Sequence, residues 1–375
     1  MGEVVAFGDN VECIASNASS STFFFMDKEN NATGGGGGGS DGGDDGDGGN
    51  GGDGGDGGGV VASPGLRVVP AEPGLGTWRT WGVLHATKLR AVPSDLPLVE
   101  SAQLGVNPPT ALRMLDDFVR LTPCQDDEAG TEDGDVDVTA VTAVTDVTFA
   151  VAATVALNAP TSAVGRAAIQ ICKHRGVPVV ALLRPRHTRE AFEADERELS
   201  DLGAVVVFAD DGKSHRSADA REGLRLLPPV KLALNGVGGA SSATLASMLA
   251  KDGVVVTYGG MARQPANVPT GALIFKNISA RGFWLTRWLA DEKKKTAKSA
   301  ATAEAANDRT SASIPRTPRR IREMTDELFG LVREGKLRMP AREVGLDDVV
   351  TALAEPAKVG GRKVLIRLTS GGKDS

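Results

Sequence analysis

Residues 157–186 constrain the fold of this chain more than any other segment. A helix is expected from Ser162, which can cap its first turn, to about Arg175. Gly176 ends it, and residues 177–183 are short, apolar and β-branched, as in a buried parallel strand. With the apolar run 151–157 before it, the segment predicts one βαβ unit. The expected apolar stripe of the helix consists of Val164, Ala167, Ala168 and Ile171.

This βαβ unit carries features of a dinucleotide site. A phosphate binds well at a helix N-terminus, where backbone N–H groups and the helix dipole favour negative charge. Arg184 and Arg186 follow the second strand, where an acid would bind a ribose 2′-hydroxyl and arginines suit a 2′-phosphate, as in NADP(H). The full G-x-G-x-x-G fingerprint is absent, and only Gly165 stands where close helix–strand packing favours glycine. An ordinary helix–strand pair with solvated arginines remains the alternative.

Composition narrows the class of protein. The 375 residues suffice for two domains, and the net charge of −6 equals the six aspartates of the Gly/Asp tract 34–59, which holds no basic residue. Nucleic-acid binding therefore gets no support. Cys13, Cys124 and Cys172 are too scattered for a disulfide framework, and no spacing indicates a metal site. No apolar run approaches the ~20 residues of a membrane span.

Strands and helices alternate along the middle of the chain. Strands are expected at 231–234, 253–258 and 279–285, a helix at 241–249, and another helix that opens at Asn107. An amphipathic helix at 319–335 and a strand at 363–368 follow. The alternation predicts an α/β fold with a doubly wound parallel sheet. Ligands bind such sheets at the carboxyl ends of strands, where Asn158, Arg184, Asn235 and Gly259 fall.

Short motifs occur in a characteristic order along the chain. They are GLGTWRT (74–80), VPSDLPL (92–98), LGVNP (104–108), NAPTSAVG (158–165), the Arg184/Arg186 pair, NGVGG (235–239), YGGMA (258–262) and RGFWL (281–285). Their order resembles the zinc-free branch of the medium-chain dehydrogenase/reductase superfamily, and most of all the mitochondrial trans-2-enoyl-CoA/ACP reductases. The resemblance implies NADPH-dependent reduction of 2-enoyl thioesters, carried by CoA or by acyl carrier protein, in mitochondrial fatty acid synthesis.

The resemblance also implies roles for particular residues. Asn107 is expected to contact the cofactor near the nicotinamide, and Arg362 stands near a basic position of the family that lies close to the cofactor. The other expected residues are Thr161, Ser162, Ala163 and Val164 for the pyrophosphate, Arg184 and Arg186 for the 2′-phosphate, and Tyr258, Gly259, Gly260, Met261, Phe283, Trp284 and Leu285 for the nicotinamide and acyl cleft.

A Rossmann domain inserted in a GroES-like, β-rich catalytic domain is the fold that the resemblance implies, with the catalytic domain truncated here. The expected parts are a disordered Gly/Asp-rich tail at 1–59, a catalytic-domain remnant at 60–104, the NADP-binding Rossmann domain at 105–288 with an acidic insertion at about 124–138, a low-complexity insertion at 289–318 and a return to the catalytic domain at 319–375.

The family's tyrosine proton donor has no counterpart, because the one tyrosine of this sequence, Tyr258, lies in the cofactor turn. Tyr258 is a candidate substitute for the donor. A catalytically impaired NADPH-binding relative, or an incomplete gene product, is therefore one alternative. A quinone-reductase-like NADPH oxidoreductase is another.

Assembly and location are also expectations from the resemblance. It implies a homodimer and a mitochondrial location. Residues 1–30 carry several acids against the single base Lys28, which makes a poor transit peptide, so a cytoplasmic location stays open.

Overall fold

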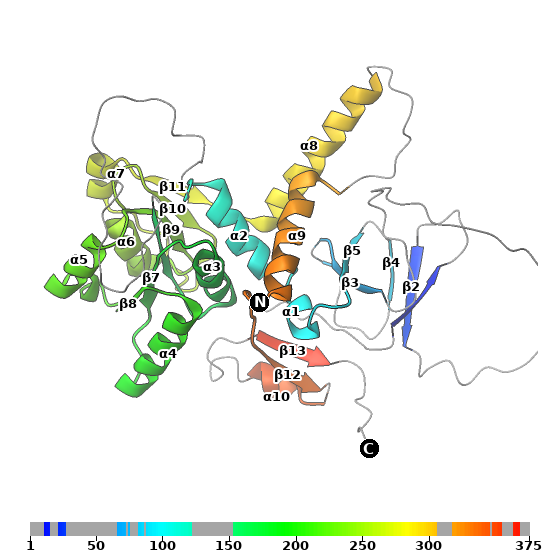
Figure 1. Ribbon diagram of the computed structural model, residues 1–375, viewed down its shortest axis with the longest axis horizontal. Helices are drawn as coiled ribbons and strands as arrows, with labels where there is room; N and C mark the ends of the chain where they lie inside the picture. The colour runs from blue at the N-terminus through cyan, green and yellow to red at the C-terminus, as the bar shows by residue number, and fades with distance from the viewer. Residues whose placement is uncertain are drawn as a thin grey trace, which may run out of the picture.

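The structure is a computed structural model that describes residues 11–15, 22–27, 66–72, 74–75, 82–85, 88–121, 153–305, 317–345, 347–354 and 363–367. Figure 1 shows a large parallel sheet with its helices on one side and several small sheets on the other, with α8 and α9 between them. None of the described helices has the length and apolar character needed to cross a membrane.

The large sheet has six parallel strands in the order β11-β10-β9-β6-β7-β8. This is the strand order of a Rossmann sheet, with a topological switch point between β6 and β9. Every residue of β6 and β7 is buried, which explains their continuous apolar sequences. The predicted doubly wound α/β fold is confirmed. The strands are β6 (Thr154–Asn158), β7 (Val179–Leu183), β8 (Val206–Ala209), β9 (Val230–Asn235), β10 (Val254–Thr257) and β11 (Ser279–Gly282).

The helix predicted after β6 is confirmed as α3. Its N-cap is Ser162, whose hydroxyl accepts a hydrogen bond from the Gly165 N–H at 3.1 Å, and all four predicted stripe residues are buried. Gly176 has a φ of 68°, the left-handed conformation that commonly ends a helix. The helices around the sheet are α3 (Ala163–His174), α4 (Arg189–Leu202), α5 (Ala218–Arg225), α6 (Gly239–Met248) and α7 (Thr270–Lys276), with a 3-10 turn at Ser214–Arg216.

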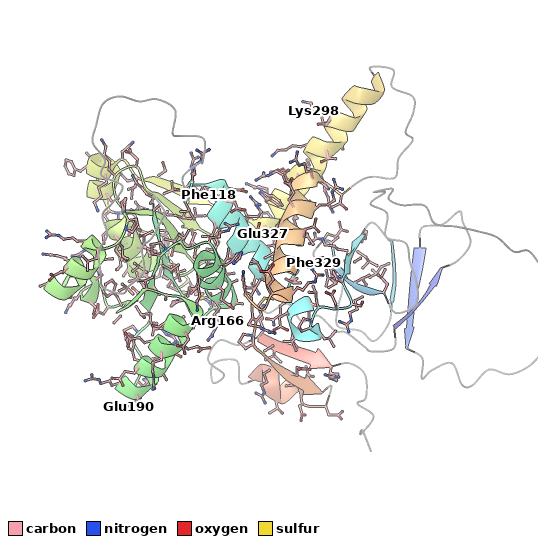
Figure 2. All side chains as sticks on the ribbon, viewed as in Figure 1. Phe118, Arg166, Glu190, Lys298, Glu327 and Phe329 are labelled. Carbon is pink, nitrogen blue, oxygen red and sulfur yellow. The ribbon has the colours of Figure 1, made fainter. Side chains whose placement is uncertain are left out.

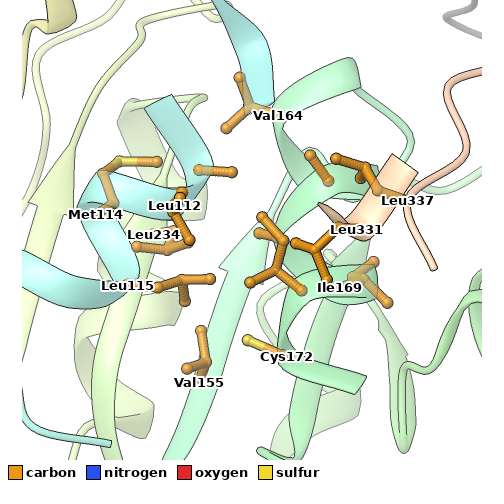
Figure 3. Close-up of a cluster of buried hydrophobic side chains, with 14 of the residues drawn as sticks. Leu112, Met114, Leu115, Val155, Val164, Ile169, Cys172, Leu234, Leu331 and Leu337 are labelled. Carbon is orange, nitrogen blue, oxygen red and sulfur yellow. The ribbon is translucent and has the colours of Figure 1, made fainter. Parts of the chain in front are cut away.

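The main hydrophobic core lies where α2 (Asn107–Asp117) and α9 (Arg319–Arg333) pack beside α3 and the sheet. Figure 3 shows Leu112 from α2, Ile169 from α3 and Leu331 from α9 in this core. Arg175 pairs with Asp116 at 2.6 Å and with Glu327 at 2.7 Å, and Figure 2 shows Glu327 on α9 beside α2. The residues predicted to face inward from α9 are all buried, namely Ile321, Met324, Leu328 and Leu331.

The remaining strands form small sheets. In one of them β1 (Val11–Ala15), β2 (Thr22–Asp27) and β4 (Gly82–His85) pair antiparallel, and β3 (Arg67–Pro70) pairs antiparallel with β5 (Leu89–Val92). The predicted C-terminal strand is β13 (Lys363–Arg367), which pairs parallel with β12 (Ala341–Gly345). The other helices are α1 (Leu98–Ser101), α8 (Leu285–Ala305) and α10 (Val349–Ala354).

The structure differs from two expectations and adds a helix to a third segment. The tail expected to be disordered contains β1 and β2, because short runs of β-forming residues precede the Gly/Asp tract, which itself lies outside the described residues. The stretch expected as a low-complexity insertion is helical as far as Ala305, since its alanine, lysine and glutamate residues favour a helix. The strand expected at 279–285 ends at Gly282, since β10 offers no partner beyond Thr257.

Candidate functional site at the carboxyl edge of the sheet

Strand register brings most of the predicted site to one edge of the large sheet. Asn158 at the end of β6 pairs with Leu182, so that Arg184 lies two residues beyond that pair. On the other side, Thr257 pairs with both Asn235 and Gly282. The segments after β6, β7, β9, β10 and β11 therefore all leave the sheet at the same edge, across the switch point.

The N-terminus of α3 presents backbone N–H groups at this edge. Within the described part of the chain, the N–H groups of Ala163 and Val164 have no hydrogen-bond acceptor, and both point out of the first turn. A Cβ on Gly165 would lie 2.5 Å from the Ala159 carbonyl oxygen, so glycine is required for the helix to start this close to β6. Thr161, Ser162 and Ala163 are half-buried. Their position fits the predicted pyrophosphate site.

The two arginines after β7 differ in their state. Arg184 is exposed and makes no hydrogen bond or ion pair with any described residue. Arg186 is half-buried, and its Nε donates to Oδ2 of Asp195 on α4 at 2.5 Å. No acid follows β7 directly, which agrees with a 2′-phosphate subsite rather than a 2′-hydroxyl subsite. Asp195 was not found from the sequence.

A series of hydrogen-bonded polar side chains, centred on the buried Asn158, Asn235 and Ser241, lies at the switch point. Asn158 is fully buried, and its Nδ2 donates to Oδ1 of Asn235 at 2.9 Å and to Oγ of Ser241 at 2.8 Å. Ser241 in turn donates to Asp210 after β8, and Nδ2 of Asn235 donates to Thr257 at the end of β10 at 3.1 Å. Burial raises the pKa of Asp210, against the opposing effect of the Ser241 hydrogen bond. This series of hydrogen bonds links the ends of β8, β6, β9 and β10.

Asn158 and Asn235 also accept hydrogen bonds from the backbone N–H groups of the turn after β9. Oδ1 of Asn158 accepts from the Gly236 N–H at 2.7 Å, and Oδ1 of Asn235 accepts from the N–H groups of Val237 and Gly238 at 3.2 and 3.0 Å. The Gly239 N–H donates to the Pro265 carbonyl at 2.8 Å. The N–H groups of Gly236, Val237, Gly238 and Gly239 are therefore all engaged within the protein, and this turn leaves none of them for a ligand.

The turn after β10 packs directly on the turn after β9. Met261 N–H donates to the Gly236 carbonyl at 3.1 Å, and a Cβ on Gly259 would lie 3.1 Å from the same oxygen. The Tyr258 hydroxyl lies against Gly236, where an added Cβ would be 2.7 Å from it. Burial raises the pKa of Tyr258 to about 12, although a hydrogen bond with Ser162 acts in the opposite direction. Tyr258 is thus a very weak acid at neutral pH.

The remaining predicted residues differ in their exposure. Met261 and Trp284 are exposed by 64% and 63%, and Gly260 is exposed as well, so these residues can meet a ligand. Phe283 is half-buried in an edge-to-face contact with Phe118, and Leu285 is buried, so both support the site from the core side. Asn107 opens α2 and is half-buried, while Arg362 lies outside the described residues.

Asp195 and Asp210 are the residues that sequence reasoning missed. Asp195 contacts the candidate residue Arg186, and Asp210 contacts Ser241, which joins it to Asn158; neither acid belongs to a recognisable motif. Over the described ranges, no group of three His, Cys, Asp or Glu side chains is placed to hold a metal ion.

Comparisons with known proteins agree with this geometry. The family model of the zinc-binding dehydrogenases matches residues 163–307. A mitochondrial enoyl-[acyl-carrier-protein] reductase of Xenopus tropicalis is 35% identical over 293 residues, which cover 78% of this chain and 68% of that protein. The protein of the same name from Caenorhabditis elegans is 36% identical over 274 residues, and the match covers 73% of this chain but only 62% of the relative.

Comparison with solved structures points to the same group of proteins. A complex of Etr1p with NADP and crotonyl-CoA has a TM-score of 0.59 at 25% identity and covers 82% of this chain and 75% of that one. The mitochondrial 2-enoyl thioester reductase heterodimer Etr1p/Etr2p of Candida tropicalis has a TM-score of 0.58 at 25% identity, with coverages of 79% and 73%. The chain therefore belongs to the zinc-free medium-chain dehydrogenase/reductases, in the family that contains the mitochondrial enoyl-[acyl-carrier-protein] reductases.

Proposed function

We propose that this chain is an NADPH-dependent reductase of 2-enoyl thioesters, with enoyl-CoA or enoyl-[acyl-carrier-protein] as substrate. The observation that carries the proposal is the open N-terminus of α3 beside a strand end with two arginines and no acid. The names of the relatives and the NADP and crotonyl-CoA in the Etr1p structure support the same reaction class.

The residues at the edge of the sheet divide the work of binding. The N–H groups of Ala163 and Val164 would hold pyrophosphate oxygens, since a helix N-terminus favours anions. Arg184 and Arg186 would hold the 2′-phosphate by charge-assisted hydrogen bonds. Met261 and Trp284 are exposed at the strand ends across the switch point and would line the cleft for nicotinamide and acyl chain. The bound cofactor would supply the hydride.

The cofactor preference has a direct test. Fluorescence titration of the whole chain with NADPH and NADH should show tighter binding of NADPH, and Arg184→Ala should weaken NADPH by about tenfold or more while NADH changes little. Arg189→Ala is the matched control, because Arg189 is also exposed but is paired with Glu193 on α4. Equal affinities of the wild type for both cofactors would contradict the proposal.

A catalytically impaired NADPH-binding relative is the second candidate. Tyr258 is the one tyrosine of the sequence, and its hydroxyl is packed against Gly236 with a raised pKa, which suits a structural contact better than proton donation. NADPH oxidation measured with crotonyl-CoA, with a quinone as the parallel acceptor, separates the candidates. Turnover with crotonyl-CoA supports the reductase, and tight NADPH binding without turnover supports the impaired relative.

We further propose that the chain forms a homodimer. Among the described strands, β11 pairs only with β10; all four of its residues are exposed, and Ile274 and Phe275 on the neighbouring α7 are exposed by 65% and 83%. An open edge strand beside an apolar helix face favours pairing with a second copy. Phe275→Asp should lower the mass measured by light scattering, whereas Val350→Asp, at a residue of α10 that is 76% exposed, should not. A monomeric wild type would contradict the dimer.

A mitochondrial location is proposed from the relatives, which carry that location in their names. Imaging of the whole chain with a C-terminal fluorescent tag tests it, and a diffuse cytoplasmic signal would contradict it.

A further inference from the structure

We propose that Asp195 is a positioning residue that holds Arg186 ready for the 2′-phosphate and thereby contributes to the preference for NADPH over NADH. The inference rests on the proposed function, because it needs Arg186 to meet the 2′-phosphate. It adds a specificity-determining residue on α4 that no motif of the sequence indicates.

The contact between Asp195 and Arg186 leaves the two terminal nitrogens of the guanidinium open. Asp195 Oδ2 contacts only Nε of Arg186, at 2.5 Å, and the two side chains are 22% and 19% exposed. Arg186 makes no other hydrogen bond or ion pair with the described residues. Its Nη1 and Nη2 therefore remain available, and these two nitrogens can bind two phosphate oxygens at once.

The ion pair of Arg166 with Glu198 on the same helix is an example of an arginine whose nitrogens are all engaged within the protein. Glu198, one turn further along α4, binds both terminal nitrogens of Arg166, and Nε of Arg166 donates to the Thr161 carbonyl at 3.0 Å. All three nitrogens of Arg166 are thus engaged with the protein, although it lies in the first turn of α3. The Asp195 contact differs, because it fixes the plane of the Arg186 guanidinium without engaging Nη1 or Nη2.

Pre-orientation has a thermodynamic value at this position. A free arginine loses side-chain rotamer entropy when it binds a ligand, and Arg184 is in that state, being exposed and without a partner among the described residues. Arg186 has already lost much of this freedom to Asp195. A rigid and a mobile arginine would then share the 2′-phosphate, with Arg186 setting its position.

The start of α4 does not depend on this contact. Thr188 caps the helix and accepts from the Ala191 N–H at 3.2 Å. Removal of the Asp195 carboxylate should therefore leave the helix in place, so that the affected property is ligand binding rather than folding.

The test compares two probes that differ only in the 2′-phosphate, namely adenosine 2′,5′-bisphosphate and 5′-AMP, titrated calorimetrically into the whole chain. Asp195→Ala should weaken the bisphosphate about fivefold to tenfold and leave 5′-AMP within about twofold. Asp195→Asn keeps an acceptor for Nε and should restore most of the bisphosphate affinity. Glu193→Ala, an exposed acid on the same helix, is the control and should change neither probe.

A double-mutant cycle separates this effect from a general one. Arg186→Ala should weaken the bisphosphate, and adding Asp195→Ala to it should cause no further loss, because Asp195 acts through Arg186. An unchanged or tighter bisphosphate affinity in Asp195→Ala overturns the inference and leaves the proposed function standing. A wild type that binds both probes equally overturns the inference together with the 2′-phosphate subsite of the proposed function.

Discussion

Asn158 and Asn235 end neighbouring strands and are joined directly, with 2.9 Å between Nδ2 of the first and Oδ1 of the second. Both side chains are fully buried. Between them they satisfy three backbone N–H groups of the turn after β9 and connect the two halves of the sheet at its switch point. Polar side chains in such a place are costly to bury, and their hydrogen bonds offset that cost.

Asn158→Ala should destabilise the protein by about 2–3 kcal/mol, because the Gly236 N–H is left buried without an acceptor. Urea unfolding followed by circular dichroism measures the change. Asn267→Ala is the control, since the described hydrogen bonds of Asn267 use its backbone atoms only. A loss below about 0.5 kcal/mol would show that the network is not structurally important.

Gly165→Ala should cost about 2 kcal/mol of stability, because the new methyl group would meet the carbonyl oxygens of Ala159 and Pro160 at 2.5 and 2.7 Å. Gly330→Ala is the matched substitution, since it also lies in a helix but has open space around its Cα. That change should stabilise the protein by up to about 1 kcal/mol. Thermal unfolding of both variants should thus shift in opposite directions, and equal shifts would contradict the close approach of α3 to β6.

His215 should make the stability depend on pH in the weakly acidic range. Its pKa is lowered by burial and by the charge of Arg216, and Nε2 accepts from Arg216 Nε at 3.2 Å, which requires a neutral ring. In the unfolded chain the imidazole of His215 binds a proton near pH 6.5, whereas in the folded chain it stays neutral to a lower pH. The stability of the fold therefore falls as the pH drops below 6.5. His215→Leu should flatten the pH profile of urea midpoints between pH 7.5 and 5.5, and an unchanged slope would contradict this.

Arg113→Lys should destabilise the junction of α2, α8 and α9 by about 1–2 kcal/mol. Arg113 pairs with Asp117 and, at 3.2 Å, with Asp116, and its guanidinium lies 5.1 Å from the ring of Trp288 on α8. Lysine keeps the positive charge but lacks the several nitrogens that pair with the two aspartates and the planar group that lies over the Trp288 ring.

The control for that junction is Arg319→Lys, which affects an exposed pair with Glu323 on α9 and should change stability by less than about 0.5 kcal/mol. Equal effects at the two positions would show that the contact with Trp288 adds nothing.

The sequence predicted those parts of the fold that local chemistry determines. α3 could be placed from its cap and apolar stripe, and α9 from its inward residues, because both patterns lie within one element. Asn158 and Asn235 could be placed at strand ends, but their mutual bond joins residues 77 positions apart and leaves no local signal. Asp195 was missed for a different reason: it is close to Arg186 in sequence, but their contact depends on how α4 packs beside the loop after β7.

The composition of residues 289–318 predicted a low-complexity insertion, and that assignment stays a prediction. Alanine, lysine, threonine and glutamate make up most of α8 beyond Asp291, and these residues continue the helix to Ala305. The alternation of strands and helices predicted the strand ends that gather at the switch point.

The position of α9 has a consequence for the synthesis of the protein. All six strands of the large sheet come from residues 154–282, so a ribosome has finished them well before it reaches Arg319. Until α9 emerges, the apolar faces of α2 and α3 that it covers in the core face solvent on the nascent chain. A transcript that stops between these points would encode a complete sheet whose neighbouring helices α2 and α3 lack the cover of α9, which makes early termination there a route to aggregation rather than to a smaller soluble domain.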